Sequence, residues 1–138
     1  MTGSRREKEA RVQVIEREGL PKVRLPGRVL QNVVGKDGRS KSGRMTMGFA
    51  HYSAESGPME PHHHAEEICY IIDARGGWVS FGPSREHLPE RAALRPGMTL
   101  HVAELEWHVF EYDEGGFVDI IFFYGQVDNI RPEEMKKG

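Results

Sequence analysis

The sequence has very little cysteine and no long hydrophobic run. Its single cysteine, Cys69, allows no disulfide within the chain, and a reducing compartment is compatible with this composition. No apolar run approaches the roughly 18 residues that a transmembrane helix needs. The opening segment MTGSRREKEARVQV is charged where a secretory signal would be apolar. We therefore expect a cytoplasmic protein that does not insert into a membrane.

A strong charge of either sign is also absent. The 138 residues carry a formal net charge of -2, so no large basic surface favours nucleic acid or an anionic membrane as partner. A small molecule or another protein is the expected partner. Hydrophobic residues make up 38% and aromatic residues 9%, which is enough to build a core, and the length suits one domain over residues 1–138.

Turn-forming residues divide the chain into short segments. Sixteen glycines and eight prolines separate runs rich in Val, Ile, Phe and Tyr, and no run keeps a 3.6-residue periodicity for more than about two turns. This pattern predicts an all-β sandwich or barrel. The expected strands are 11–16, 28–34, 45–52, 67–73, 77–81, 98–103, 107–112 and 117–124.

The connections have distinct compositions. DARGG at 73–77 and DEGG at 113–116 contain the Gly and Asp residues of tight hairpin turns. The segment 35–44 is expected to be a flexible, solvated basic loop, and 82–97 a longer polar excursion. The first ten residues and 131–138 are expected to be solvated ends.

Metal-ligand side chains gather in the segment MEPHHHAEEICYII at 59–72. His62, His63, His64 and Glu67 lie within six residues, and His108 follows 41 positions after Glu67 in another expected strand. Imidazole and carboxylate groups are ligands for Zn, Mn, Fe or Ni, and rigid strands position such groups well. The alternative is a polar strand edge whose histidines face water, and histidine density alone does not decide between the two.

The two histidine segments together resemble the cupin family. Its first motif, G-x5-H-x-H-x3 or 4-E-x6-G, is similar to Gly57, the histidine cluster, Glu67 and the run ICYII that follows. Its second, G-x5-P-x-G-x2-H-x3-N, is similar to RPGMTLHVAELEWHVF at 95–110, with His108 in the place of the fourth metal ligand. The resemblance covers residues 57–112. It implies a cupin-type double-stranded β-helix, a jelly-roll-like barrel, with its core at about 28–125, an N-terminal strand or arm and a short C-terminal tail.

The first motif departs from the family pattern. Counting back from Glu67 reaches His63 paired with Pro61, or His62 paired with Glu60, whose carboxylate is also a potential ligand. The pair His62 and His64 leaves only two residues before Glu67. Strand alternation would place 63, 65 and 67 on one face unless a bulge shifts the register. Two of the three histidines are expected to reach the metal, and the choice of two stays open.

Three other positions bear on the site. His101 is the candidate general acid or base, with a solvated surface histidine as the alternative. His51 shares an alternating face with Met47 and Phe49, which is expected to line the barrel interior. Cys69 shares the face of Glu67 and is expected to be inert packing.

The resemblance implies a divalent metal and a small-molecule ligand or substrate. As an enzyme, the protein would use the metal as a Lewis acid on an oxygen-bearing substrate, a sugar or a keto or hydroxy acid, in isomerisation, epimerisation or elimination, or as a dioxygenase if the metal were iron. The alternative is a non-catalytic binding or sensor protein. Cupin-like proteins are commonly dimers, and the run RVQVIE at 11–16 could add to a neighbour's sheet, so a homodimer is expected.

Overall fold

A computed structural model describes residues 11–134. The strands are β1 (Val23–Leu25), β2 (Arg28–Gly35), β3 (Ser40–Lys41), β4 (Thr46–Ser53), β5 (Glu67–Gly82), β6 (Glu90–Ala93), β7 (Thr99–Val102) and β8 (Trp107–Tyr124). Within these described residues there are also three short 3-10 helices, η1 (Arg17–Gly19), η2 (Ala54–Ser56) and η3 (Pro132–Glu134). Of the solvated ends expected at 1–10 and 131–138, residues 1–10 and 135–138 lie outside the described residues. The expectation was wrong for Arg131, which is only 9% exposed and donates a hydrogen bond to Asn32 of β2.

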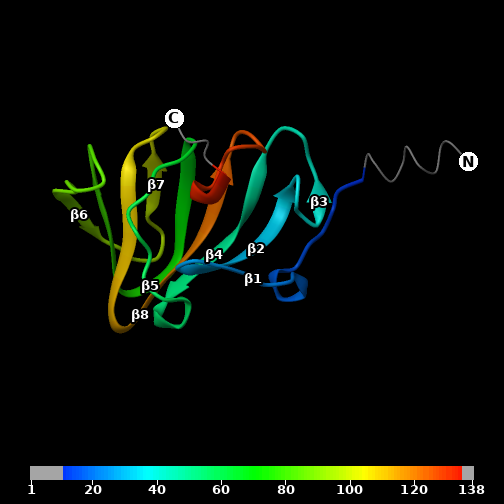
Figure 1. Ribbon diagram of the computed structural model, residues 1–138. Coiled ribbons are helices and arrows are strands. Elements are labelled where there is room, and N and C mark those ends of the chain that lie inside the picture. Colours follow the sequence, from blue (N-terminus) through cyan, green and yellow to red (C-terminus); the bar gives the residue numbers. More distant parts are fainter. Residues whose placement is uncertain (1–10, 135–138) are drawn as a thin grey trace, which may run out of the picture.

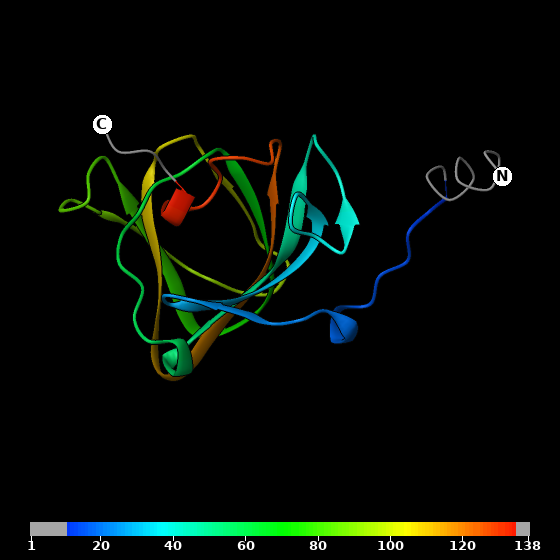
Figure 2. The same ribbon diagram turned by 45° about the vertical axis from the view of Figure 1, so that its right-hand side comes forward.

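Two long strands, β5 and β8, organise the barrel (Figure 1). They pair with each other along their whole length, and the ladder bends halfway. The half that contains Glu67–Arg75 and Phe117–Tyr124 continues through β4, β2 and β1 on one side and β7 on the other. The half that contains 77–82 and 107–112 continues into β6. The strands curve around one interior in Figure 2, which confirms the all-β, jelly-roll-like barrel.

The two glycine-rich segments are bends within strands, so the expectation of hairpin turns was wrong. The register passes from Arg75 opposite Phe117 to Gly77 opposite Tyr112, which leaves residues 113–116 as an insertion in β8. Gly76 adopts φ 55° at this point, in the left-handed region that favours glycine. Local turn chemistry is the same in a bulge and in a hairpin, and here long-range pairing between β5 and β8 keeps both strands extended. The expected pairs 67–73 with 77–81 and 107–112 with 117–124 are therefore halves of single strands.

The N-terminal run does not form the strand expected at 11–16. Val12 and Val14 are each 87% exposed, and this segment extends from the barrel (Figure 1). Strand-forming residues need a partner strand, and 11–16 has none among residues 11–134. The expected homodimer stays a prediction. In contrast, β3 and β6 form inside segments expected to be loops, because pairing with β2 and β5 outweighs their polar composition.

Alternation along the strands separates a buried face from an outer face. Cys69 and Ile71 are fully buried, whereas Ile68 and Tyr70 are 46% and 43% exposed. The face of His51, expected to line the interior, is the outer one, because Ala50 and Tyr52 on the opposite side of β4 enter the core. Both faces of β4 carry apolar residues, so the period-2 pattern alone could not assign the inner one.

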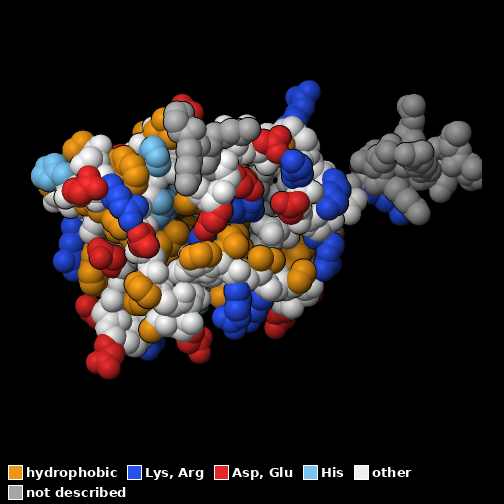
Figure 3. Space-filling model, viewed as in Figure 1, with side chains coloured by type: hydrophobic (Ala, Val, Ile, Leu, Met, Phe, Trp, Pro, Cys, Tyr) orange, Lys and Arg blue, Asp and Glu red, His pale blue; other side chains and the backbone are white. Residues whose placement is uncertain are grey.

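The visible surface carries charges of both signs. On the face shown in Figure 3, acidic and basic side chains are interspersed with apolar ones. Among residues 11–134, no helix is long and apolar enough to cross a bilayer.

Candidate metal centre

The site is built where the segment before β5 crosses the start of β8. His62 and His108 form an antiparallel bridge with two backbone hydrogen bonds, His62 N to His108 O at 3.0 Å and His108 N to His62 O at 2.9 Å. Directly opposed residues of an antiparallel pair project their side chains to the same side. The bridge therefore places these two imidazoles next to each other, with ring centroids 4.5 Å apart.

A tight turn between β7 and β8 positions the third histidine. The backbone N–H of Leu105 donates to the carbonyl oxygen of His64 at 2.8 Å, and the turn is closed by Glu106 N donating to Ala103 O at 3.1 Å. Leu105 has φ 63°, a left-handed conformation that a leucine rarely adopts. The turn thus links the backbone of His64 to the residues that immediately precede β8, the strand that carries His108.

Each of the three imidazoles has one nitrogen bonded to a backbone carbonyl. His62 Nδ1 lies 2.9 Å from Glu60 O, His64 Nδ1 lies 2.8 Å from Ala65 O, and His108 Nδ1 lies 2.8 Å from Glu106 O. A carbonyl only accepts, so Nδ1 must carry the proton in each ring, and Nε2 is left with its lone pair. Such backbone bonds are the usual way in which a ligating histidine is oriented.

The ring nitrogens converge. His62, His64 and His108 each offer one ligand atom within 4.8 Å of the others. His64 Nε2 and His108 Nε2 are 3.1 Å apart. Two nitrogens bound to one ion at about 2.0–2.1 Å, with angles between about 90° and 109°, are separated by about 2.8–3.4 Å. The three histidines could therefore hold a metal ion.

Burial keeps these histidines neutral. Desolvation, reinforced by the neighbouring His108, lowers the pKa of His62 to about 2 and that of His64 to about 4. Desolvation also lowers the pKa of His108. Imidazole binds metals only in its neutral form, so the three rings are ready to ligate at neutral pH without losing protons.

Glu67 adjoins the three histidines through His64. Its Oε1 lies 3.4 Å from His64 Nε2, and the residue is only 5% exposed. Burial raises the pKa of Glu67 to about 7, although hydrogen bonds from the side chains of Cys69 and Tyr124 act in the opposite direction. Burial likewise raises the pKa of the Cys69 thiol, which stays protonated within the core.

The remaining candidates lie away from the convergent nitrogens. His63 stacks on Trp107, with ring centroids 4.1 Å apart. The carboxylate of Glu60 pairs with Arg85 at the surface. The two histidines of the cluster that converge with His108 are His62 and His64. They precede β5, so strand alternation does not apply to them.

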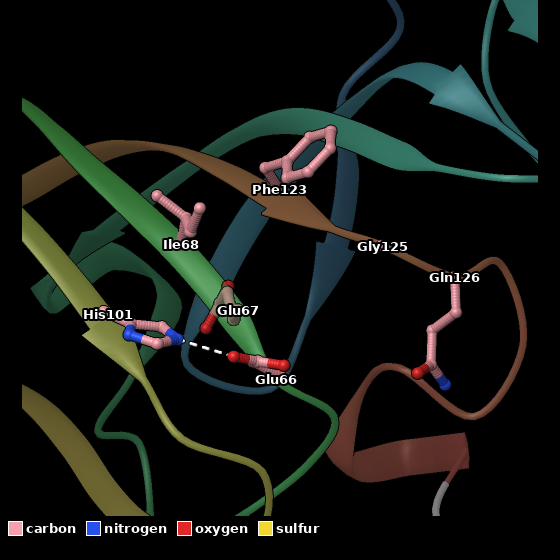
Figure 4. Close-up of a pocket in the computed structure, with 7 residues that line it drawn as sticks. All are labelled: Glu66, Glu67, Ile68, His101, Phe123, Gly125 and Gln126. Carbon is pink, nitrogen blue, oxygen red and sulfur yellow. Dashed lines mark hydrogen bonds and ion pairs between the residues drawn. The ribbon is translucent and has the colours of Figure 1, made fainter.

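His101 belongs to the outer surface. Its side chain is 66% exposed, and its Nε2 lies 2.6 Å from Glu66 Oε2, an interaction drawn in Figure 4. These two residues border a shallow pocket of about 260 Å³, together with Ile68, Phe123 and Gln126. The imidazole of His101 is thus held at the surface by a carboxylate, apart from the three convergent rings.

A second, smaller cavity reaches His108 itself. It has a volume of about 200 Å³ and is lined by Val79, Phe81, Thr99, Leu100, His101, Val102, Glu106 and His108. Sequence reasoning did not single out its apolar wall, because Val79, Phe81, Leu100 and Val102 look like ordinary core positions of two strands. Only the pairing of Phe81 with His108 places that wall beside the histidines.

Comparison with known proteins identifies the fold. No family model matches the chain, and no curated protein matches it in sequence. A protein from Planctomyces limnophilus is similar in structure, with TM-score 0.65, 16% identity, and coverage of 86% of this chain and 93% of that one. The polyketide cyclase RemF from Streptomyces resistomycificus is similar with TM-score 0.65 and 17% identity, and the match covers 93% of this chain and 88% of that one. Fe(II)-HppE with an alternative substrate is similar with TM-score 0.59 and 14% identity, and the match covers 82% of this chain and 60% of that one.

Proposed function

We propose that the protein is a metal-dependent enzyme in which His62, His64 and His108, with Glu67 as a fourth ligand, hold a divalent ion that binds a small oxygen-bearing substrate. One observation carries this proposal. With every Nδ1 proton committed to a carbonyl, the Nε2 lone pairs of His64 and His108 face each other at 3.1 Å. Two acceptors with no proton between them repel, and a cation between them removes that repulsion.

The donor set suits several first-row metals. Three imidazoles and a carboxylate are compatible with Mn, Fe, Ni or Zn. Fe(II)-HppE, which shares the fold, contains iron, and this similarity supports a divalent ion here. The 3.4 Å separation between Glu67 Oε1 and His64 Nε2 also fits two atoms that share one ion.

The bound ion would supply Lewis-acid catalysis by polarising a carbonyl or hydroxyl group, as in an isomerase, epimerase or lyase, or oxidative chemistry if it were iron. The chain's own residues have separate roles. The carbonyls of Glu60, Ala65 and Glu106 fix the orientation of the rings. Val79 and Val102, both almost fully buried, form an apolar wall of the cavity beside His108.

Metal content tests this proposal directly. Untagged protein would be analysed for Mn, Fe, Ni and Zn before and after dialysis against a chelator, and again after reloading. We expect near-stoichiometric metal in the wild type and in His101→Gln, whose imidazole lies at the surface, but little metal in His108→Gln. Far-ultraviolet circular dichroism would show that each variant is folded. A wild type without metal after reloading, or a His108→Gln variant that retains it, would overturn the proposal.

A further inference from the structure

The cavity beside His108 lies between the two halves of the barrel. One side is β7, which pairs with Glu67–Tyr70 of β5. The other side is the second half of β5, where Phe81 pairs directly with His108 of β8. Adjacent side chains on one face of a pleated pair lie within about 5.5 Å, so Phe81 is the immediate neighbour of the His108 ring on the side away from His62. A molecule bound beside His108 would therefore lie over Phe81.

The wall of this cavity is apolar. Val79 and Val102 are 4% and 7% exposed, and Phe81 and Leu100 pack against the same core. The polar lining residues other than His108, which are Thr99, His101 and Glu106, are solvent-exposed or half-exposed at the mouth. Among residues 11–134, the lining contains no Lys, Arg, Asn or Gln.

Such a wall discriminates among substrates. Each hydroxyl that enters an apolar cavity without a hydrogen-bond partner costs free energy, so a polyol is disfavoured. A phosphate or sulfate on the part of the substrate that lies against this wall is disfavoured as well, because the lining side chains of residues 11–134 include no Lys or Arg and do include the acidic residue Glu106. The cavity volume of about 200 Å³ limits the size of the apolar group that can bind. Apolar cavities of about 150 Å³ accept a benzene ring, so this one has room for a ring with a short substituent.

We propose that the substrate is a small carbonyl or enol compound with an aromatic ring or a branched aliphatic group, bound with its oxygen atoms towards the histidines and its apolar part against Val79, Phe81, Leu100 and Val102. The same wall disfavours sugars and phosphorylated metabolites. This inference rests on the proposed function, because it takes the metal to hold the oxygen atoms.

A matched set of chelating probes tests the wall separately from the metal. Acetohydroxamate, benzohydroxamate and gluconohydroxamate carry the same metal-binding group and differ only in the attached part. Each would be titrated into Co(II)-loaded protein, with the visible absorption of the cobalt as readout. We expect benzohydroxamate to bind about 10- to 100-fold more tightly than acetohydroxamate, because the phenyl ring leaves water for the apolar wall, and gluconohydroxamate to bind no better than acetohydroxamate.

Variants locate the effect. Leu100→Gln should bring the ratio of the benzohydroxamate and acetohydroxamate affinities close to one while cobalt binding is retained, and Leu100→Ala should lower it in part. Ile68→Gln is the control. Ile68 pairs with His101, the residue after Leu100 in β7, but its side chain lies on the outer face. Equal affinities in cobalt-loaded wild type, or an unchanged ratio in both Leu100 variants, would overturn this inference alone. Failure to take up cobalt would overturn the proposed function as well.

Discussion

The buried imidazole of His64 should make the stability of the metal-free protein depend steeply on pH. Burial lowers its pKa in the folded state to about 4, against 6.5 for the exposed side chain. The unfolded chain therefore takes up a proton first as the pH falls, which favours unfolding. The stabilisation is fully present above pH 6.5 and is lost between pH 6.5 and about 4. At about 1.36 kcal/mol for each unit of pKa difference, His64 accounts for about 3 kcal/mol.

Urea denaturation of chelator-treated protein at several pH values measures this effect. The wild type and His64→Gln would be compared, so that pH effects common to both proteins cancel. We expect the free energy of unfolding of the wild type to fall by about 3 kcal/mol more than that of the variant between pH 7 and pH 4. His101→Gln, which changes an exposed imidazole, should follow the wild type. Parallel pH profiles for wild type and His64→Gln would refute the argument that His64 is held neutral by burial.

Three further outcomes are expected. Arg17→Ala should lower the free energy of unfolding by about 1–3 kcal/mol in urea denaturation, because it removes two 2.8 Å hydrogen bonds to Asp119, a residue that is 8% exposed; an unchanged midpoint would contradict this. Leu105→Gly should raise the free energy of unfolding by about 0.5–1 kcal/mol, because glycine adopts φ 63° without strain, and a lower melting temperature would count against it. Cys69 should react with a thiol reagent only after unfolding, because it is fully buried and its thiol pKa is raised; rapid labelling of native protein would disprove this.

The strand pattern was predictable because it depends on local composition, whereas strand continuity was not. The runs at 28–34, 45–52 and 98–103 correspond to β2, β4 and β7. The segments 73–77 and 113–116 have the residues of hairpin turns, and only the register between β5 and β8 makes them bends. Pairing partners lie up to 57 residues apart in this ladder, from Glu67 to Tyr124, and no local pattern carries that information.

The site shows the same division between local and long-range information. The histidine cluster and His108 stand out by residue type, and their proximity follows from a two-motif resemblance. The sequence does not reveal that His62 and His64, and not His63, converge with His108. That arrangement depends on the backbone bridge between His62 and His108 and on the turn at Leu105. The surface position of His101 was equally hidden, since it follows from the register of β7 against β5, which sets His101 opposite the outward-facing Ile68.

The continuous ladder between β5 and β8 has a consequence for the order of folding. Its shortest loop joins Gly82 to Trp107, and every later pair encloses a longer one, up to Glu67 with Tyr124. Loop closure costs least conformational entropy for the shortest loop, so we expect the ladder to grow outward from that end. Phe81 and His108 form the second pair of the ladder. Within this ladder, we therefore expect His108 and the aromatic ring beside it to pair before Glu67 meets Tyr124.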